Sequence, residues 1–146
     1  MTEPIKGFFG DNAFLSNFYK HEEIEWEGKK AKTVEHLFQA FKTNSIQERR
    51  KVLEAETPGE AKRLGRKVTM RLDWEEAKIG VMRNLLFMKF QIPRLQKKLL
   101  ATGDAYLEET NNWGDHFWGA NKNGYGQNWL GKLLMEVRLE ICNHKK

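Results

Sequence analysis

Three polar side chains share one line of a predicted helix at residues 34–42, whose sequence is VEHLFQAFK. At about 100° of rotation per residue, Glu35, Gln39 and Lys42 fall within roughly 60° of one another, beside an arc of bulky apolar residues. A carboxylate and an amine that project together into a cleft are the groups of proton transfer and nucleophilic attack. The alternative, which is commoner on such helices, is a solvated polar stripe beside a core stripe.

The chain just before this helix has the pattern of a hairpin followed by a helix cap. Apolar and polar residues alternate in 23–33 and Gly28 supplies a turn, which predicts a short β element. Thr33 stands where an N-cap belongs, so the helix is expected to begin at the next residue. Residues 10–20, ahead of the hairpin, are interpreted as a loop.

Two further helix starts are marked by capping residues. Thr57 is followed by Pro58 and Glu60, and Asp73 by Glu76, which is the pattern of a capped first turn. The helix after Asp73 carries a broad apolar face and is interpreted as the central buried helix.

The remainder of the chain is predicted as two helices separated by a long loop. A helix in 94–104 is expected to be closed by Gly103, after Pro93 ends or bends the preceding element. Residues 108–126 are predicted to form a loop. Residues 130–142 are predicted to form an amphipathic helix that docks on the core.

The long loop is unusually aromatic and could bind a planar ligand. Trp113 and Trp118 stand among glycines and asparagines, with Asp115 close by. Such loops stack on planar groups, although both indoles could instead fold back over the core. Asn17 and Phe18 offer another amide and ring; the alternative is that Phe18 is a core anchor and Asn17 a turn residue.

Composition bounds the class of protein. The chain has 146 residues, 40% of them hydrophobic, which suits one domain with a real core. Cys142 is the single cysteine, so a disulfide within the chain is excluded, and the four histidines lack the spacing of a zinc site. No signal peptide or membrane span is apparent, and we expect a cytoplasmic protein without metal.

Charge alone does not select a ligand. The net charge of +5 comes from 25 basic and 20 acidic residues that are interspersed along the chain. A nucleic-acid binder, an enzyme for phosphate-bearing small molecules and an ordinary basic domain therefore stay open. The chain has neither a Gly-rich phosphate loop of the Walker type nor a helix-turn-helix signature.

In several ordered blocks the chain resembles the NADAR family, also called YbiA-like. The E-H-x-x-Q-x-x-K block of the first helix is joined by later D-x-x-W-G and G-x-N-x-L-G-x-L-L-M blocks, and the combination is specific. Further matching blocks are LSNFY at 15–19, LGR at 64–66, Trp74, Met82, KF at 89–90 and TG at 102–103. This chain has Gly114 where the family pattern often has Asn, and an additional Trp113, differences that bear on substrate choice.

The resemblance implies a fold, an activity and a set of residues. The fold would be α+β, a predominantly helical single domain over residues 1–146 with a small N-terminal β element. The activity would be hydrolysis of an N-glycosidic bond to ribose, with no cofactor and no obligate protein partner. Substrates would be phosphoribosylamino-pyrimidine intermediates of riboflavin biosynthesis or ADP-ribose on guanine, including ADP-ribosylated DNA. Glu35 and Lys42 would be catalytic, and the substrate-binding residues would be Asn17, Phe18, Gln39, Asp115, Trp118, Gly119 and Asn128.

Two mechanisms follow from this resemblance. Glu35 can stabilise the oxocarbenium character that develops at C1, or move a proton. The family points to Lys42 as a nucleophile that forms a Schiff base, but at pH 7 only about 1 in 2,500 ordinary lysines is neutral. Burial would lower the pKa of Lys42 and an ionised Glu35 would raise it. In the rival route Lys42 stays charged as an anchor and Glu35 activates water.

An alternative hypothesis, from another functional class, is that the protein is a non-catalytic module that binds ADP-ribose or nucleic acid. Such a module would keep its affinity for an ADP-ribosylated base and release no ribose product. The sequence does not separate it from the enzyme, nor the two mechanisms from each other.

Overall fold

The computed structural model describes residues 2–145 and has the predicted α+β fold, mainly helical with two small sheets. The chain divides into two compact units. The central unit is Asn17–Lys89, and the terminal unit combines the residues up to Ser16 with those from Phe90 onward. The expectation of a single domain over 1–146 stays a prediction.

The central unit opens with the predicted hairpin. Strand β2 (Ile24–Trp26) pairs antiparallel with β3 (Lys29–Ala31). The two residues between them, Glu27 and Gly28, have φ of 51° and 79°. Positive φ at both central positions is what a tight two-residue hairpin turn requires, and it explains the glycine.

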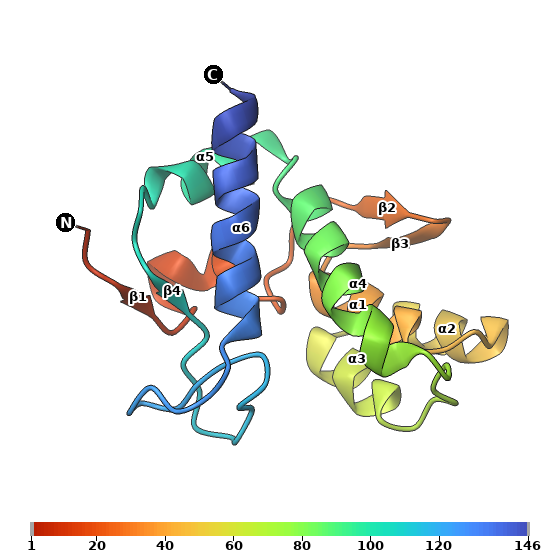
Figure 1. Ribbon diagram of the computed structural model, residues 1–146. Coiled ribbons are helices and arrows are strands. Elements are labelled where there is room, and N and C mark those ends of the chain that lie inside the picture. The colour runs from red at the N-terminus through yellow and green to blue at the C-terminus, as the bar shows by residue number, and fades with distance from the viewer. Residues whose placement is uncertain (1, 146) are drawn as a thin grey trace. The chain divides into compact units, whose positions relative to one another are not determined.

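Helix α1 (Val34–Phe41) is the centre of this unit and begins where Thr33 predicts. The Thr33 hydroxyl accepts from the His36 N–H at 3.0 Å. The helix packs against all three of its neighbouring helices and every one of its residues is buried, so its polar side chains lie within the protein. These neighbours are α2 (Ile46–Leu53), α3 (Pro58–Gly65) and α4 (Trp74–Lys89), shown in Figure 1 with α2 and α3 at the lower end of the unit.

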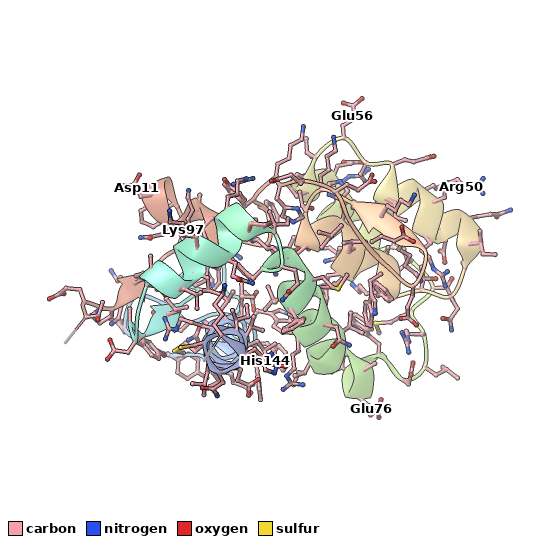
Figure 2. The ribbon with its side chains drawn as sticks, turned by 90° about the horizontal axis from the view of Figure 1, so that it is seen from above. Asp11, Arg50, Glu56, Glu76, Lys97 and His144 are labelled. Atoms are coloured by element: carbon pink, nitrogen blue, oxygen red, sulfur yellow. The ribbon has the colours of Figure 1, made fainter. Side chains whose placement is uncertain are left out.

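Helix α2 was not predicted, although its cap is visible in the sequence. The Ser45 hydroxyl accepts from the N–H of Glu48, as in the Ser-x-x-Glu pattern. The Glu48 carboxylate accepts from the N–H of Thr69 instead, at 3.0 and 3.1 Å, and so ties α2 to the segment after α3. Figure 2 shows Arg50 of α2 pointing away from the helices, as expected for a mostly solvated helix.

Helix α4 begins at Trp74 as predicted. The broad apolar face predicted from the sequence comprises Trp74, Ala77, Val81, Met82, Leu85, Leu86, Met88 and Phe90, and all of these residues are buried except Ala77 and Met88, which are half-buried. The last residue of the helix, Lys89, departs further from what the sequence predicts. Lys89 is fully buried, and this burial lowers its pKa to about 7. Its amine lies 5.7 Å from the centre of the Tyr19 ring.

The terminal unit contains a pair of strands and a 3-10 helix that the sequence did not reveal. Strand β1 (Ile5–Lys6) pairs in parallel with β4 (Leu107–Glu108), about a hundred residues later. A 3-10 helix, η1 (Gly10–Leu15), lies where a loop was predicted, and it buries Phe14 and Leu15. Strands of two residues show no periodicity, so their sequence carries no signal.

The two predicted helices of the terminal unit are confirmed. Helix α5 (Pro93–Ala101) carries Pro93 in its first turn, and Gly103 follows its end with φ of 63°. Helix α6 (Trp129–His144) contacts β4, and in Figure 1 the long loop lies at its N-terminal end. Its buried apolar face is Leu130, Leu133, Leu134, Val137 and Ile141. Within residues 2–145, no helix has the length and apolar character that crossing a bilayer requires.

Candidate active site

Glu35 is buried in the first turn of α1, with 7% of the residue exposed. Its N–H donates to the carbonyl of Asn17 at 3.0 Å, which fixes the start of the helix against the segment before the hairpin. Its Oε2 accepts from Nε2 of Gln39, its neighbour one turn on, at 2.6 Å. Burial of both residues rules out the solvated stripe.

The other polar atom of Gln39 is unusual. Gln39 Oε1 is buried and has no hydrogen-bond partner among residues 2–145. Leaving such an atom unsatisfied costs about 1–3 kcal/mol, which a bound donor would offset. Gly65, at the end of α3, makes the room for this amide, because a Cβ at residue 65 would overlap Oε1.

Lys42 follows α1 directly, and its side chain is half-buried. Its ammonium makes no hydrogen bond or ion pair with the part of the chain that the structure describes. Burial lowers the pKa of Lys42 below 10.5; the charge of Glu35 opposes this, and the charges of Arg66 and Lys78 reinforce it. The two opposing effects predicted from the sequence are therefore both present, and the lowering prevails.

Asn17 and Phe18 lie at the start of the same unit. Asn17 donates through Nδ2 to the sulfur of Met82 at 3.6 Å, and its Oδ1 is buried without a hydrogen-bond partner among the described residues. Phe18 is 43% exposed, with the amine of Lys62 at 5.9 Å from its ring centre. Phe18 is therefore not a core anchor, and its ring is accessible.

The central unit thus combines three kinds of chemical group around α1. Glu35 can donate and accept a proton. Lys42, when neutral, can attack an electrophilic carbon, and its lowered pKa enlarges the neutral fraction. Gln39 Oε1 and Asn17 Oδ1 can each accept a hydrogen bond from a hydroxyl group.

In the long loop of the terminal unit, Asp115 holds a turn. Its Oδ1 accepts from the N–H of Phe117 at 3.2 Å and of Trp118 at 2.9 Å. Trp118 is half-buried and meets Phe117 edge to face, with ring centres 4.8 Å apart. Trp113 is largely exposed. The loop therefore keeps part of its aromatic surface accessible, as its composition predicts.

Gly119 is a buried residue of the same loop, and Asn128 is the buried residue just before α6. A Cβ at Gly119 would overlap the carbonyl of Glu109. Asn128 has φ of 51°; its Oδ1 accepts from the Glu109 N–H at 3.0 Å, and its Nδ2 donates to the Leu107 carbonyl at 2.9 Å and to the Tyr106 hydroxyl at 3.2 Å. These contacts give both residues a role in holding the loop to β4, and their contact with substrate stays a prediction.

The predicted site residues therefore fall into two groups. Two further residues, whose charges act on Lys42, were not predicted. The first group surrounds the start and the polar line of α1, and the second lies in or next to one loop. Arg66 and Lys78, whose charges act on Lys42, were not predicted, because they come from other helices and no spacing relates them to α1. The groups are Asn17, Phe18, Glu35, Gln39 and Lys42 in the central unit, and Asp115, Trp118, Gly119 and Asn128 in the terminal unit.

The model of the NADAR domain matches residues 7–142. The chain belongs to the NADAR family. An NMR structure of the Escherichia coli protein YbiA has the same fold, with a TM-score of 0.85 and 37% sequence identity. That similarity covers 99% of this chain and 89% of the YbiA chain.

Relatives in this family carry two kinds of name. N-glycosidase YbiA of Shigella boydii is 41% identical over 152 residues, which cover 99% of this chain and 93% of the relative. N-glycosidase Npun_R5314 of Nostoc punctiforme is 40% identical over 139 residues, or 88% and 85% of the two chains. A riboflavin biosynthesis protein of Vibrio vulnificus is 39% identical over 149 residues, but this chain spans only 40% of its length. This NADAR chain is thus an enzyme of the N-glycosidase class.

Proposed function

We propose that this NADAR protein hydrolyses the bond between ribose and a base nitrogen in anionic ribosides, with Lys42 as nucleophile and Glu35 as the proton-transferring group. The observation that carries the proposal is the state of Lys42. Its half-buried amine has a lowered pKa, lies on the same helix face as Glu35 and makes no ion pair or hydrogen bond within residues 2–145.

In the first step the neutral amine of Lys42 forms a bond to C1 of the ribose as the C1–N bond breaks. Protonated Glu35 delivers its proton to the departing base nitrogen, so the base leaves neutral. The Lys42 nitrogen then returns a proton to Glu35. Gln39 holds a sugar hydroxyl through its Oε1, the buried acceptor without a partner among the described residues.

In the second step the ribose ring opens. The bond from C1 to the ring oxygen breaks, that oxygen takes the proton from Glu35, and an imine joins Lys42 to C1. Water then adds to the imine, releases the ribose as an aldehyde and restores Lys42. Neither step calls on a metal or an organic cofactor.

Two substrate types fit this chemistry. One is a phosphoribosylamino-pyrimidine of riboflavin biosynthesis, a proposal that the name of the Vibrio relative supports. The other is ADP-ribose attached to guanine in a nucleotide or in DNA. Both are ribosides with a planar base and a phosphate, which suits a net charge of +5 and an aromatic loop.

The experiment offers both substrates in parallel, adds borohydride during turnover and identifies products and peptides by mass. An imine intermediate is reduced to a stable adduct, so the peptide containing Lys42 should gain the mass of the reduced sugar. Lys42→Arg keeps the charge but cannot form the adduct, and should lose turnover. Lys51→Arg, at an exposed lysine of α2, is the control and should be trapped like the parent.

The other readings predict different results. Substantial turnover by Lys42→Arg, with no trapped peptide in the parent, would make Lys42 an anchor and favour direct attack by water assisted by Glu35. Binding of both compounds with no ribose released on long incubation would favour the non-catalytic module.

A further inference from the structure

The guanidinium group of Arg66 lies next to the proposed site, and no acidic side chain within residues 2–145 pairs with it. It follows α3 directly, is exposed, and makes no side-chain hydrogen bond or ion pair within residues 2–145. Arg63, one turn earlier on α3, is committed by contrast: its Nε donates to Oε2 of Glu60 at 3.0 Å. The two arginines therefore differ in whether an acidic partner already holds them.

The position of Arg66 is set by the contact between α3 and α1. Gly65, its immediate neighbour, packs against the side chain of Gln39, which places the end of α3 on the polar line of α1. The charge of Arg66 is close enough to lower the pKa of Lys42. Arg66 is a cation without an ion pair within residues 2–145, so an anion bound beside it would be stabilised.

An independent feature indicates the rest of the ligand. Gln39 Oε1 is buried beside Gly65 and lacks a hydrogen-bond partner among the described residues, so it calls for a donor. An acceptor for a hydroxyl group beside a site for an anion matches one class of compound, a phosphorylated sugar.

We propose that Arg66 binds the phosphate on C5 of the ribose that is cleaved, and thereby makes the enzyme selective for phosphorylated ribosides. The inference rests on the proposed function, because it takes the ribose to lie across α1. A guanidinium can donate two parallel hydrogen bonds to one phosphate, which a lysine cannot. The 5-phosphate is shared by phosphoribosyl compounds and by ADP-ribose, where it is part of the diphosphate.

Binding tests the inference without depending on turnover. Calorimetry would compare ribose, ribose 5-phosphate and ADP-ribose on the parent, on Arg66→Ala and on the control Arg63→Ala. The parent should bind ribose 5-phosphate better than ribose, and Arg66→Ala should reduce that preference about 10- to 100-fold. Arg63→Ala should keep it. The preference of the parent for ribose 5-phosphate or ADP-ribose distinguishes the two sources of the phosphate.

A comparison of ligands also separates phosphate binding from the effect on Lys42. If Arg66 acts only through the pKa of Lys42, its removal makes Lys42 more cationic and does not weaken the phosphorylated ligands relative to ribose. A preference for the phosphate that Arg66→Ala keeps would therefore overturn the inference. A parent with no preference for the phosphate would overturn it as well. A protein that turns over no riboside but loses its preference in Arg66→Ala would refute the proposed function and support the phosphate site.

Discussion

Two buried amides in different parts of the molecule use their polar atoms in opposite ways. Asn128, 2% exposed, makes three side-chain hydrogen bonds that fasten the long loop to β4 and its surroundings. Gln39, 7% exposed, makes one, to Glu35, and its Oε1 has no partner among residues 2–145. Both amides belong to the motifs that define the family resemblance, yet only Gln39 offers a ligand an atom that the protein has not already used.

This difference has an energetic side. An unsatisfied buried amide oxygen costs about 1–3 kcal/mol, a cost that a hydrogen bond from a bound ligand would offset. A satisfied amide contributes to folding instead. Substitutions in the polar line of α1 should therefore affect activity more than stability, and substitutions at Asn128 should do the reverse.

The largest effect is expected for Glu35→Gln. Because the proposed proton transfer occurs in the transition state, turnover should fall about 100- to 10,000-fold, while ligand affinity should change only a few-fold. Steady-state kinetics and calorimetry on the same preparation measure the two quantities. Near-normal turnover would remove Glu35 from the mechanism.

Asn128→Ala should mainly reduce stability. It leaves the Leu107 carbonyl and the Glu109 N–H without their partner and puts alanine at a positive φ, for a combined loss of about 3–5 kcal/mol. Urea unfolding gives this number, with Asn123→Ala at an exposed position of the same loop as control. A variant of normal stability that no longer binds substrate would contradict the assignment and make Asn128 a ligand-binding residue.

Trp118→Ala tests whether the loop has both roles. If the half-buried indole stacks on the base, affinity should fall by about 1–3 kcal/mol with the melting temperature little changed. Titration and thermal melting of the same variant distinguish the outcomes, since normal binding with early melting would indicate a packing role alone.

Gln39→Met keeps the side-chain volume and removes the unsatisfied oxygen. It also removes the Nε2 donor to Glu35, so a gain and a loss oppose each other. We expect the free energy of unfolding to change by less than about 1.5 kcal/mol, well below the loss at Asn128, while the KM for the riboside rises. A loss of stability as large as that of Asn128→Ala would show that the two amides do not differ in the way described.

The smallest effect concerns pH. The charge of Lys78 lowers the pKa of Lys42, so Lys78→Met should raise that pKa and leave less neutral amine at a given pH. The limb of the pH–rate profile that rises with pH should therefore move to higher pH. Lys67→Met, at an exposed residue after α3, is the control, and a shift of the limb to lower pH would contradict the assignment.

Much of the fold was predictable because its signals are local. Thr33 and Thr57 cap α1 and α3 as their sequence spacing indicates, and Gly28 closes the hairpin. The pairing of β1 with β4 was not predictable, since it joins two-residue strands far apart in the chain. The 3-10 helix η1 is short and lacks a side-chain cap, and α2 was overlooked despite Ser45 and Glu48.

The candidate site likewise has a part that the sequence predicts and a part that it does not. Glu35, Gln39 and Lys42 could be grouped from the sequence because one helix carries them. The spacing of residues could not show that Arg66 comes near Lys42, that Asn128 is fully engaged in hydrogen bonds, or that Lys89 is buried at the end of a face predicted to be apolar. Each depends on how separate elements pack, which periodicity within one element does not report.

The contact between Gly65 and Gln39 has a consequence for how this fold can diverge. A side chain at position 65 would occupy the space of the Gln39 amide, so a change at 65 requires the side chain of residue 39 to move or to become shorter. A lineage that gained even a methyl group at 65 would have to displace or shorten the side chain of residue 39, and the buried acceptor would lose its present position. Position 65, though it carries no reactive group, would then distinguish chains that have kept this amide from chains that have given it up.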